Sequence, residues 1–210
     1  LLFGTTGLNM FGGAESQAAV LAHLGAICRI GGVLGATRLV FGSPKNRDRS
    51  GLEDREAHDR GVAFFRRLGD IAAAQGVIVC LEPNPPCYGA NFMTTSAETA
   101  RVVEACGHPA IRMQLDSGAM TINGEDPRVV VSSFASLVGH IHASEPNLVP
   151  LGEGGTKHDE VHAVLSQSLS ERPVSIEMVA TRTESHLTSI ERALGVADRC
   201  YRAAEKDGIS

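Results

Sequence analysis

The sequence predicts an α/β fold built on a parallel sheet, and three observations support this. Short apolar runs alternate with helix-forming stretches along the whole chain. The alternation repeats about every 30 residues, which is the length of a unit made of a strand, a helix and a second parallel strand. No linker or low-complexity stretch interrupts it. We therefore expect a single domain over residues 1–210.

Six apolar runs are predicted to be strands. They are LLFG (1–4), TRLVFGS (37–43), GVIVCLEPN (76–84), IRMQLDSG (111–118), VGHIHASE (138–145) and PVSIEMV (173–179). The helices expected between them cover about residues 14–31, 53–75, 96–106, 127–137, 159–168 and 185–206. Ser96 and Asp159 are predicted N-caps, because short polar side chains accept hydrogen bonds from the first turn of a helix.

Composition argues against several classes of function. The formal net charge of −5 and the absence of Trp give neither the basic surface nor the aromatic platform typical of nucleic-acid binding. No apolar run reaches the roughly 18 residues of a membrane span. The 5 cysteines are odd in number and lack CxxC spacing, so we expect reduced thiols in a cytoplasmic protein.

Polar residues end four successive predicted strands. Glu82 closes VIVCLE, Asp116 closes RMQLD, His142 lies in HIHAS and Glu177 closes SIE. Functional side chains recur at the C-terminal ends of the strands in a parallel (β/α)8 barrel, where they face one shared site. The glycine-rich stretch at residues 3–13 matches no phosphate-binding motif of the doubly wound folds. The pattern therefore predicts a (β/α)8 TIM barrel.

The same four residues suggest a metal site. Three carboxylates facing one site would repel one another and raise their pKa values, and a divalent metal ion removes that conflict. Three oxygen donors and one imidazole favour Mn²⁺, with Mg²⁺, Co²⁺ or Zn²⁺ as alternatives, over a closed cysteine-rich zinc site. On the pattern alone, ion pairs and a core histidine remain the competing interpretation.

Four segments carry a resemblance to a known family: LEPNPPCYGANF, QLDSGAM, HIHASEPNLVPLGEGG and SIEM. From about residue 34 onward the chain resembles the xylose isomerase-like TIM barrels. Within them it is similar to the sugar phosphate isomerase/epimerase group, which is related to ketose 3-epimerases, hydroxypyruvate isomerases and inosose dehydratases. The resemblance implies that Glu82, Asp116, His142 and Glu177 bind the metal. It also implies that the two glutamates act as acid and base.

Two further residues lie near the predicted metal histidine. His140 points to the same face of its strand as His142, one layer deeper. We expect it to pack or to hydrogen-bond so that it orients the metal ligands. Glu145 lies just past the strand end, where contact with substrate, a capping role and a surface position all stay open.

The segment GSPKNR (42–47) also follows a predicted strand, so it should lie at the same mouth of the barrel. Lys45 and Asn46 are therefore candidates for binding a carboxylate, phosphate or hydroxyl group of the substrate. For Arg47 and Arg49 the alternating basic pattern favours a solvated loop.

The chain departs from the ketose 3-epimerases at two positions that grip substrate hydroxyls in those enzymes. Ala119 stands where they carry a histidine, and Leu148 stands where they carry an arginine. We therefore expect weak activity on free ketohexoses.

The resemblance implies an isomerase or epimerase that acts on a sugar or sugar-derived hydroxy-carbonyl compound. Proton transfer would pass through a metal-stabilised enediolate. The alternatives are a dehydratase of a cyclic polyol or keto-sugar, a metal-dependent phosphoesterase, and a non-catalytic barrel subunit. Only two predicted strands precede the one that ends at Glu82, so the first two β/α units of the barrel are expected to be absent from this chain. A longer chain, a second copy or a partner would then complete the barrel.

Overall fold

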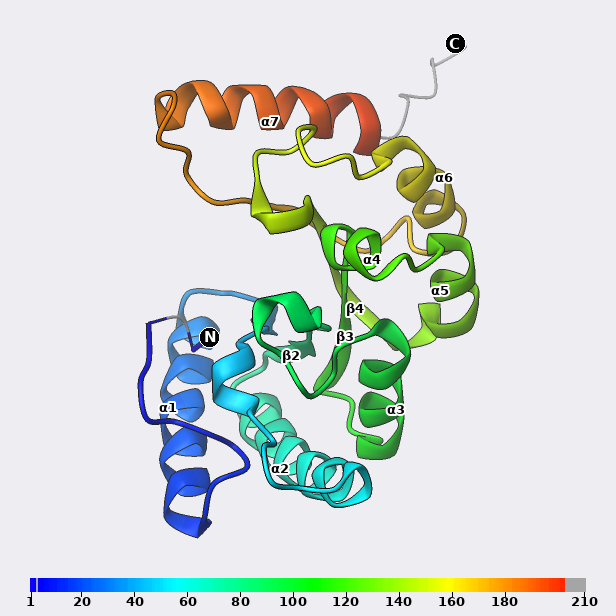
Figure 1. Ribbon diagram of the computed structural model, residues 1–210. Helices are drawn as coiled ribbons and strands as arrows, with labels where there is room; N and C mark the ends of the chain where they lie inside the picture. The colour runs from blue at the N-terminus through cyan, green and yellow to red at the C-terminus, as the bar shows by residue number, and fades with distance from the viewer. Residues whose placement is uncertain (3, 203–210) are drawn as a thin grey trace. The chain divides into compact units, whose positions relative to one another are not determined.

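The computed structural model describes residues 1–2 and 4–202, and its strands run where the sequence predicts five of the six (Figure 1). The five strands are β1 (Arg38–Phe41), β2 (Ile78–Leu81), β3 (Ile111–Asp116), β4 (Val138–Ser144) and β5 (Val174–Glu177). They form one sheet in the order β1-β2-β3-β4-β5. The pairs β1–β2, β2–β3 and β4–β5 are parallel, as the alternation of strands and helices predicts.

Helices connect the strands. The α-helices are α1 (Ala14–Val33), α2 (Asp54–Ala74), α3 (Ser96–Cys106), α4 (Ser117–Asn123), α5 (Pro127–Phe134), α6 (His158–Ser168) and α7 (His186–Tyr201). Short 3-10 helices are η1 (Pro44–Arg47), η2 (Pro86–Tyr88), η3 (Ala135–Leu137) and η4 (Pro146–Leu148). Helix α4 escapes the sequence analysis because it is short and begins at the residue directly after β3.

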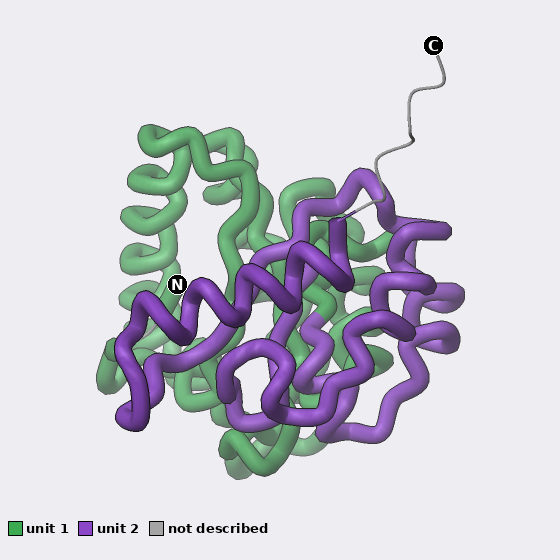
Figure 2. Tube along the Cα trace, turned by 90° about the horizontal axis from the view of Figure 1, so that it is seen from above, with its two compact units in different colours: residues 1–115, 136–140 green, residues 116–135, 141–210 purple. Residues whose placement is uncertain are grey.

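The chain forms two compact units (Figure 2). Unit 1 comprises Leu1–Leu115 with Ser136–His140, and unit 2 comprises Asp116–Ala135 with Ile141–Ser210. Strands β3 and β4 each begin in unit 1 and end in unit 2, so each unit holds its own part of the sheet. The single domain expected over residues 1–210 stays a prediction.

An aromatic cluster forms the core of unit 1. Phe41 on β1 and Phe64 and Phe65 on α2 are buried, and their rings meet edge to face with centroids 5.2 and 5.5 Å apart. Helices α1 and α3 both pack against α2 (Figure 1). The cluster thereby fixes α2 against the strand that leads into η1.

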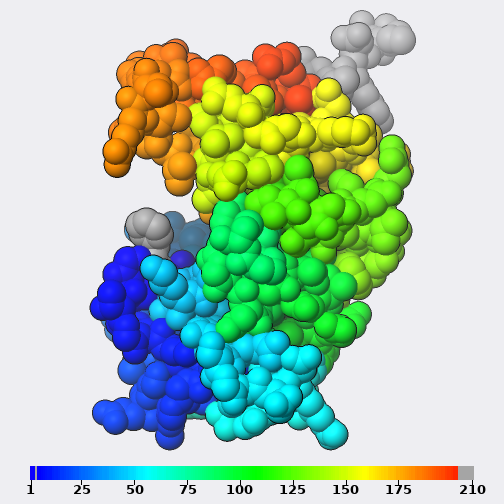
Figure 3. Space-filling model, viewed as in Figure 1, coloured from blue at the N-terminus to red at the C-terminus, as the bar shows by residue number. Residues whose placement is uncertain are grey.

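Unit 2 is built around α7 and β5. Ala193 of α7 is buried beside Ala143, and Ile176 and Met178 pack against this cluster. Leu187 and Leu194 of α7 are exposed. Helix α7 lies in the orange-to-red part of Figure 3. Strand β5 is one edge of the sheet, and its first two residues are exposed.

Three local predictions are wrong. Leu1 and Leu2 are not in a strand, although the amino group of Leu1 donates a hydrogen bond to the backbone oxygen of Val40. The N-cap of α3 is Thr95, whose hydroxyl accepts a hydrogen bond from the Glu98 amide, and Ser96 is already helical. The N-cap of α6 is Lys157 rather than Asp159, and no side chain caps it. Residues 203–206 of the last predicted helix lie outside the described residues.

No helix within residues 1–2 and 4–202 is long and apolar enough to cross a membrane.

Truncating the aromatic core should destabilise the protein. Phe65 is fully buried between two other rings, so Phe65→Ala should lower the free energy of unfolding by about 3–5 kcal/mol through lost burial and a cavity. Leu187→Ala, at a side chain that is 66% exposed, should change it by no more than about 0.5 kcal/mol. Urea denaturation followed by circular dichroism measures both, and equal effects would contradict the assigned core.

Candidate metal centre

Three of the predicted ligands meet within unit 2. His142 Nδ1 lies 3.1 Å from Glu177 Oε2 and 3.7 Å from Asp116 Oδ2. The side chains of Asp116 and His142 are 7% and 12% exposed, whereas that of Glu177 is 37% exposed. Each comes from the end of a different strand or from near it, so the sheet brings together side chains that lie far apart in the sequence.

The two oxygens of Asp116 have different roles. Oδ1 accepts a hydrogen bond of 2.6 Å from the Ala119 amide, which makes Asp116 the N-cap of α4. Oδ2 is buried and makes no hydrogen bond to any described residue. Leaving a buried carboxylate oxygen without a partner is unfavourable, so Oδ2 is suited to a cation.

The spacing of these donor atoms suits a metal ion. Divalent ions bind oxygen and imidazole nitrogen at about 2.0–2.2 Å, which places adjacent donors roughly 3 Å apart. The separations of 3.1 and 3.7 Å around His142 Nδ1 are of that size. Carboxylate and imidazole donors match the preferences of Mn²⁺, Mg²⁺ and Co²⁺.

The fourth predicted ligand, Glu82, belongs to unit 1, where it directly follows β2 and is buried. Its Oε2 accepts a hydrogen bond of 3.2 Å from Asn84 Nδ2, and its backbone oxygen accepts one of 2.8 Å from Arg47. The role of Glu82 as a metal ligand stays a prediction.

His140 is buried on β4, with Nδ1 3.2 Å from Oε1 of the fully buried Gln114. The predicted role of orienting the metal ligands stays a prediction.

Glu145 is fully buried, and the loop that follows it encloses its carboxylate. Oε1 accepts hydrogen bonds from the Gly152 amide and His158 Nε2, and Oε2 accepts one from the Thr156 amide. Burial by itself would raise the pKa of Glu145, but these hydrogen bonds outweigh it and hold the pKa below its ordinary value. Both oxygens are thus engaged within the chain, and contact with a substrate would require some of these bonds to break.

The enclosed carboxylate is connected to the last helix. His158 Nδ1 lies 2.7 Å from the hydroxyl of Tyr201 on α7. Burial raises the pKa of Tyr201 above its ordinary value. This Glu145–His158–Tyr201 chain could not be predicted from local patterns, because its members are separated by 13 and 43 residues.

The GSPKNR segment behaves differently from the prediction. Lys45 is exposed, whereas Asn46 is buried and donates hydrogen bonds to Thr5 Oγ1 and the Leu8 backbone oxygen. The prediction of a solvated Arg47 is wrong, because Arg47 is fully buried. An alternating basic pattern could not reveal this, since burial depends on the groups that the chain places around the guanidinium.

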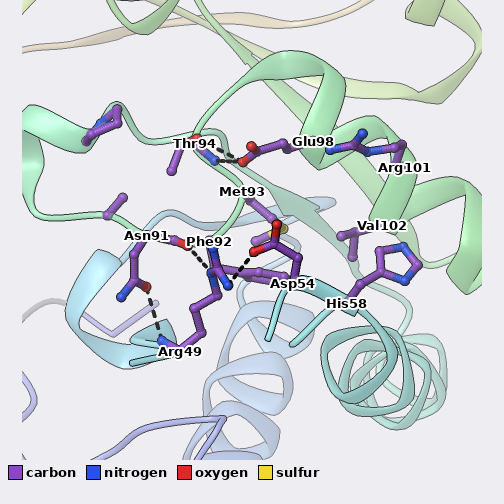
Figure 4. A pocket seen from close by; sticks show the side chains of 12 residues that line it. Arg49, Asp54, His58, Asn91, Phe92, Met93, Thr94, Glu98, Arg101 and Val102 are labelled. Carbon is purple, nitrogen blue, oxygen red and sulfur yellow. Dashed lines mark hydrogen bonds and ion pairs between the residues drawn. The ribbon is translucent and has the colours of Figure 1, made fainter. Parts of the chain in front are cut away.

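Arg49 anchors a second stretch of chain. It donates a hydrogen bond of 2.6 Å to the Asn91 backbone oxygen and forms an ion pair of 2.7 Å with Asp54 (Figure 4). Both contacts lie at a cavity of about 330 Å³ in unit 1, whose lining includes Phe92, Met93 and Arg101. The prediction of a solvated Arg49 is therefore wrong as well.

At the two positions where the chain departs from the ketose epimerases, the side chains are apolar and partly or fully buried. Ala119 is buried in the first turn of α4. Leu148 and its neighbour Asn147 both adopt positive φ, at 54° and 59°. Both backbone groups of Leu148 are hydrogen-bonded. Its amide donates to the Glu145 backbone oxygen, and its backbone oxygen accepts from the Val179 amide.

Comparison with known proteins identifies the family. Residues 4–200 match the family model described as xylose isomerase-like TIM barrel. The chain therefore belongs to the xylose isomerase-like TIM barrel family, which confirms the predicted fold class and the resemblance.

A similar curated protein is the L-ribulose 3-epimerase of Methylomonas sp. (strain DH-1), which is 28% identical over 127 residues. The match covers 60% of this chain and 44% of the epimerase, so the chain spans less than half the length of that relative.

Solved structures with the same fold include further sugar epimerases. D-psicose 3-epimerase from Clostridium cellulolyticum H10, solved with D-tagatose, superposes with a TM-score of 0.81 at 17% identity, covering 93% of this chain and 75% of that one. The 3-keto-D-glucoside 4-epimerase from E. coli gives 0.80 at 18% identity, covering 94% and 77%. D-allulose 3-epimerase from Methylomonas sp. gives 0.71 at 21% identity, covering 91% and 67%. At these identities the likeness establishes the fold.

The enclosure of Glu145 predicts a pH-dependent contribution to stability. Its lowered pKa means that the charged form is stabilised above the unfolded pKa of about 4.3, and that this contribution is lost as pH falls through the lower folded pKa. Glu145→Gln should therefore lower the free energy of unfolding by about 1.5–3 kcal/mol near pH 7, and by progressively less below pH 4.

Denaturation of the metal-free protein across pH 3–8 measures this difference. The matched control is Glu171→Gln, at an exposed glutamate whose side chain has no such enclosure. A deficit in Glu145→Gln that stays constant from pH 7 to pH 3 would contradict the charged, hydrogen-bonded state of Glu145.

Proposed function

We propose that this protein is a divalent-metal-dependent isomerase or epimerase that acts on a sugar-derived hydroxy-carbonyl compound. The observation that carries the proposal is the cluster of Asp116, His142 and Glu177. In it the His142 imidazole nitrogen lies near both carboxylates, and the buried Oδ2 of Asp116 makes no hydrogen bond to a described residue. The sugar epimerases among the relatives and the shared fold support it.

We propose Glu82, Asp116, His142 and Glu177 as the ligands, with Mn²⁺ as the preferred ion. A divalent ion bound by them would polarise a carbonyl group and stabilise the negative charge that develops beside it. The donor types support this assignment, since hard oxygen donors with a single imidazole are better suited to Mn²⁺ than to a structural zinc ion.

The two glutamates are proposed as the acid and the base. One would remove the proton from the carbon next to the carbonyl, and the other would return a proton to the same or the neighbouring carbon. Their surroundings differ: Glu82 is buried and hydrogen-bonded to Asn84, whereas the Glu177 side chain is more than a third exposed. Lys45, Asn46 and Glu145 stay candidates for contact with substrate, and of these Lys45 alone is exposed.

The substrate is proposed to differ from a free ketohexose. Ala119 and Leu148 offer no hydrogen-bonding side chain. At the same two positions the ketose epimerases carry side chains that bind substrate hydroxyls. A phosphorylated, carboxylated or cyclic keto-sugar could supply other polar contacts. The 5 free cysteines are in keeping with a reducing cytoplasm as the place of action.

The first test is metal binding. Metal-free wild-type protein should bind one Mn²⁺ per chain in a calorimetric titration. His142→Ala and Glu177→Gln should each weaken binding by more than the roughly 10–100-fold typical of changes outside the ligand shell, because each removes a donor. His186→Ala and Glu171→Gln, at exposed residues outside the cluster, should bind as the wild type does. Unchanged binding in both site variants would refute the ligand assignment.

The second test follows proton transfer. At saturating Mn²⁺ the wild type should incorporate solvent deuterium at the carbon beside the carbonyl, and Glu82→Gln and Glu177→Gln should each slow this by about 10²–10⁴-fold. Nuclear magnetic resonance on a panel of ketohexoses and of phosphorylated, carboxylated and cyclic keto-sugars measures it.

The panel also tests the substrate class. Exchange should be faster with a modified or cyclic keto-sugar than with fructose or psicose, and the reverse order would contradict the interpretation of Ala119 and Leu148. A glutamate variant with nearly the wild-type rate would exclude that glutamate from the mechanism. Glu171→Gln is the matched control for loss of a carboxylate.

A further inference from the structure

Arg47 is a fully buried cation that the proposed chemistry does not use. It is the last residue of η1, and its guanidinium contacts the chain just after β2. Nη1 donates a hydrogen bond of 2.8 Å to the Glu82 backbone oxygen, and Nη2 donates to Asn84 Oδ1. Burial lowers the pKa of Arg47 to about 10, against the opposing effect of the Glu82 charge, so it stays protonated at neutral pH.

These hydrogen bonds determine which way the Asn84 amide points. A guanidinium has only donors, so the oxygen of the Asn84 amide must face Arg47. The amide nitrogen then points to the other side, where Nδ2 donates a hydrogen bond of 3.2 Å to Glu82 Oε2. Arg47 thus acts on the Glu82 carboxylate through Asn84.

Gly42, at the end of β1, limits the carboxylate from a second direction. A Cβ atom at this position would overlap Oε2 of Glu82, so only glycine leaves the space that the carboxylate occupies. Oε2 therefore lies between the Gly42 backbone and the Asn84 amide. The hydrogen bond and the close approach of Gly42 together restrict the positions that the Glu82 carboxylate can take.

We propose that Arg47 and Asn84 are positioning residues that orient the Glu82 carboxylate for metal binding. This inference rests on the proposed function, which assigns Glu82 as a ligand. It extends that function to two residues outside the four-residue ligand set. Arg47 cannot itself be a metal ligand, because its guanidinium has only donors. Outer hydrogen bonds of this kind fix the geometry of ligating carboxylates in metal sites.

The charge of Arg47 lets an experiment distinguish a positioning role from a purely electrostatic one. Removing a cation near a metal site should strengthen metal binding if only Coulomb forces mattered, because like charges repel. A positioning role predicts the opposite, because without Arg47 the Asn84 amide is free to rotate and Glu82 loses its fixed orientation.

The experiment is a calorimetric Mn²⁺ titration of the metal-free wild type, Arg47→Met and Asn84→Leu. Arg47→Met should weaken Mn²⁺ binding by about 10–100-fold. Asn84→Leu, which changes no charge and keeps a similar shape, should weaken it by a similar factor. The matched control is Arg49→Met, because Arg49 lies two residues further on, carries the same charge and anchors the same connection after Glu82 at Asn91 (Figure 4). It should bind Mn²⁺ as the wild type does.

The outcomes separate this inference from the proposed function. If the wild type binds no Mn²⁺, the metal site itself is refuted. If the wild type binds Mn²⁺ and both Arg47→Met and Asn84→Leu bind it equally well or more tightly, the positioning role is refuted. An equal loss in Arg49→Met would refute it too, because general loosening of the loop would then explain the effect. Circular dichroism of the metal-free variants checks folding, and Asn84→Leu decides the matter if Arg47→Met does not fold.

Discussion

Parallel pairing of the strands is the constraint on which the candidate site depends. In a parallel sheet the carboxyl ends of neighbouring strands lie along the same edge, so a residue at each strand end contributes to one line of side chains. Asp116 and Glu177 are the last residues of β3 and β5, His142 lies near the end of β4, and Glu82 directly follows β2. These positions are 26 to 35 residues apart in the sequence, and the residues between them form mainly helices and loops. The helices can differ in length and composition without disturbing the site, provided that the strands keep their order and direction.

The buried carboxylates fall into two kinds, and the difference separates structural from reactive groups. Glu145 has both oxygens hydrogen-bonded by the loop that follows it, and through His158 it reaches Tyr201. Asp116 has one oxygen capping α4, while the other makes no hydrogen bond to a described residue and faces His142. Burying charge without a partner is expensive. The fully satisfied group therefore stabilises a loop, and the partly satisfied one is suited to a cation.

The segment after β1 shows how one short stretch can serve several purposes. Asn46 donates hydrogen bonds to Thr5 and Leu8, and Arg47 donates them to Glu82 and Asn84. Arg49 donates a hydrogen bond to Asn91 and forms an ion pair with Asp54. Each of these side chains donates hydrogen bonds to a part of unit 1 that is distant in sequence. Lys45, which alone is exposed among residues 45–47, is the member of the segment that stays available to a ligand.

The sequence by itself predicted the five strands of the sheet and most helices, and it supplied the four residues that are proposed as ligands, because these features depend on local pattern. An apolar run that ends in a charged residue predicts both the position of a strand and a candidate functional residue at its end. The sequence also indicated the family, through motifs that surround Glu82, Asp116, His142 and Glu177. It misplaced the N-caps of α3 and α6 by one and two residues, since Thr95 and Ser96 are equally able to cap and only the backbone geometry selects one. Tertiary structure alone decided the roles of Arg47, Arg49 and Glu145. Their chemistry is the same in a solvated loop and in a buried network, and the difference lies in which distant donors and acceptors surround them. Glu82 and Asn84, 35 and 37 residues away, offer the acceptors that replace water at Nη1 and Nη2 of the buried Arg47.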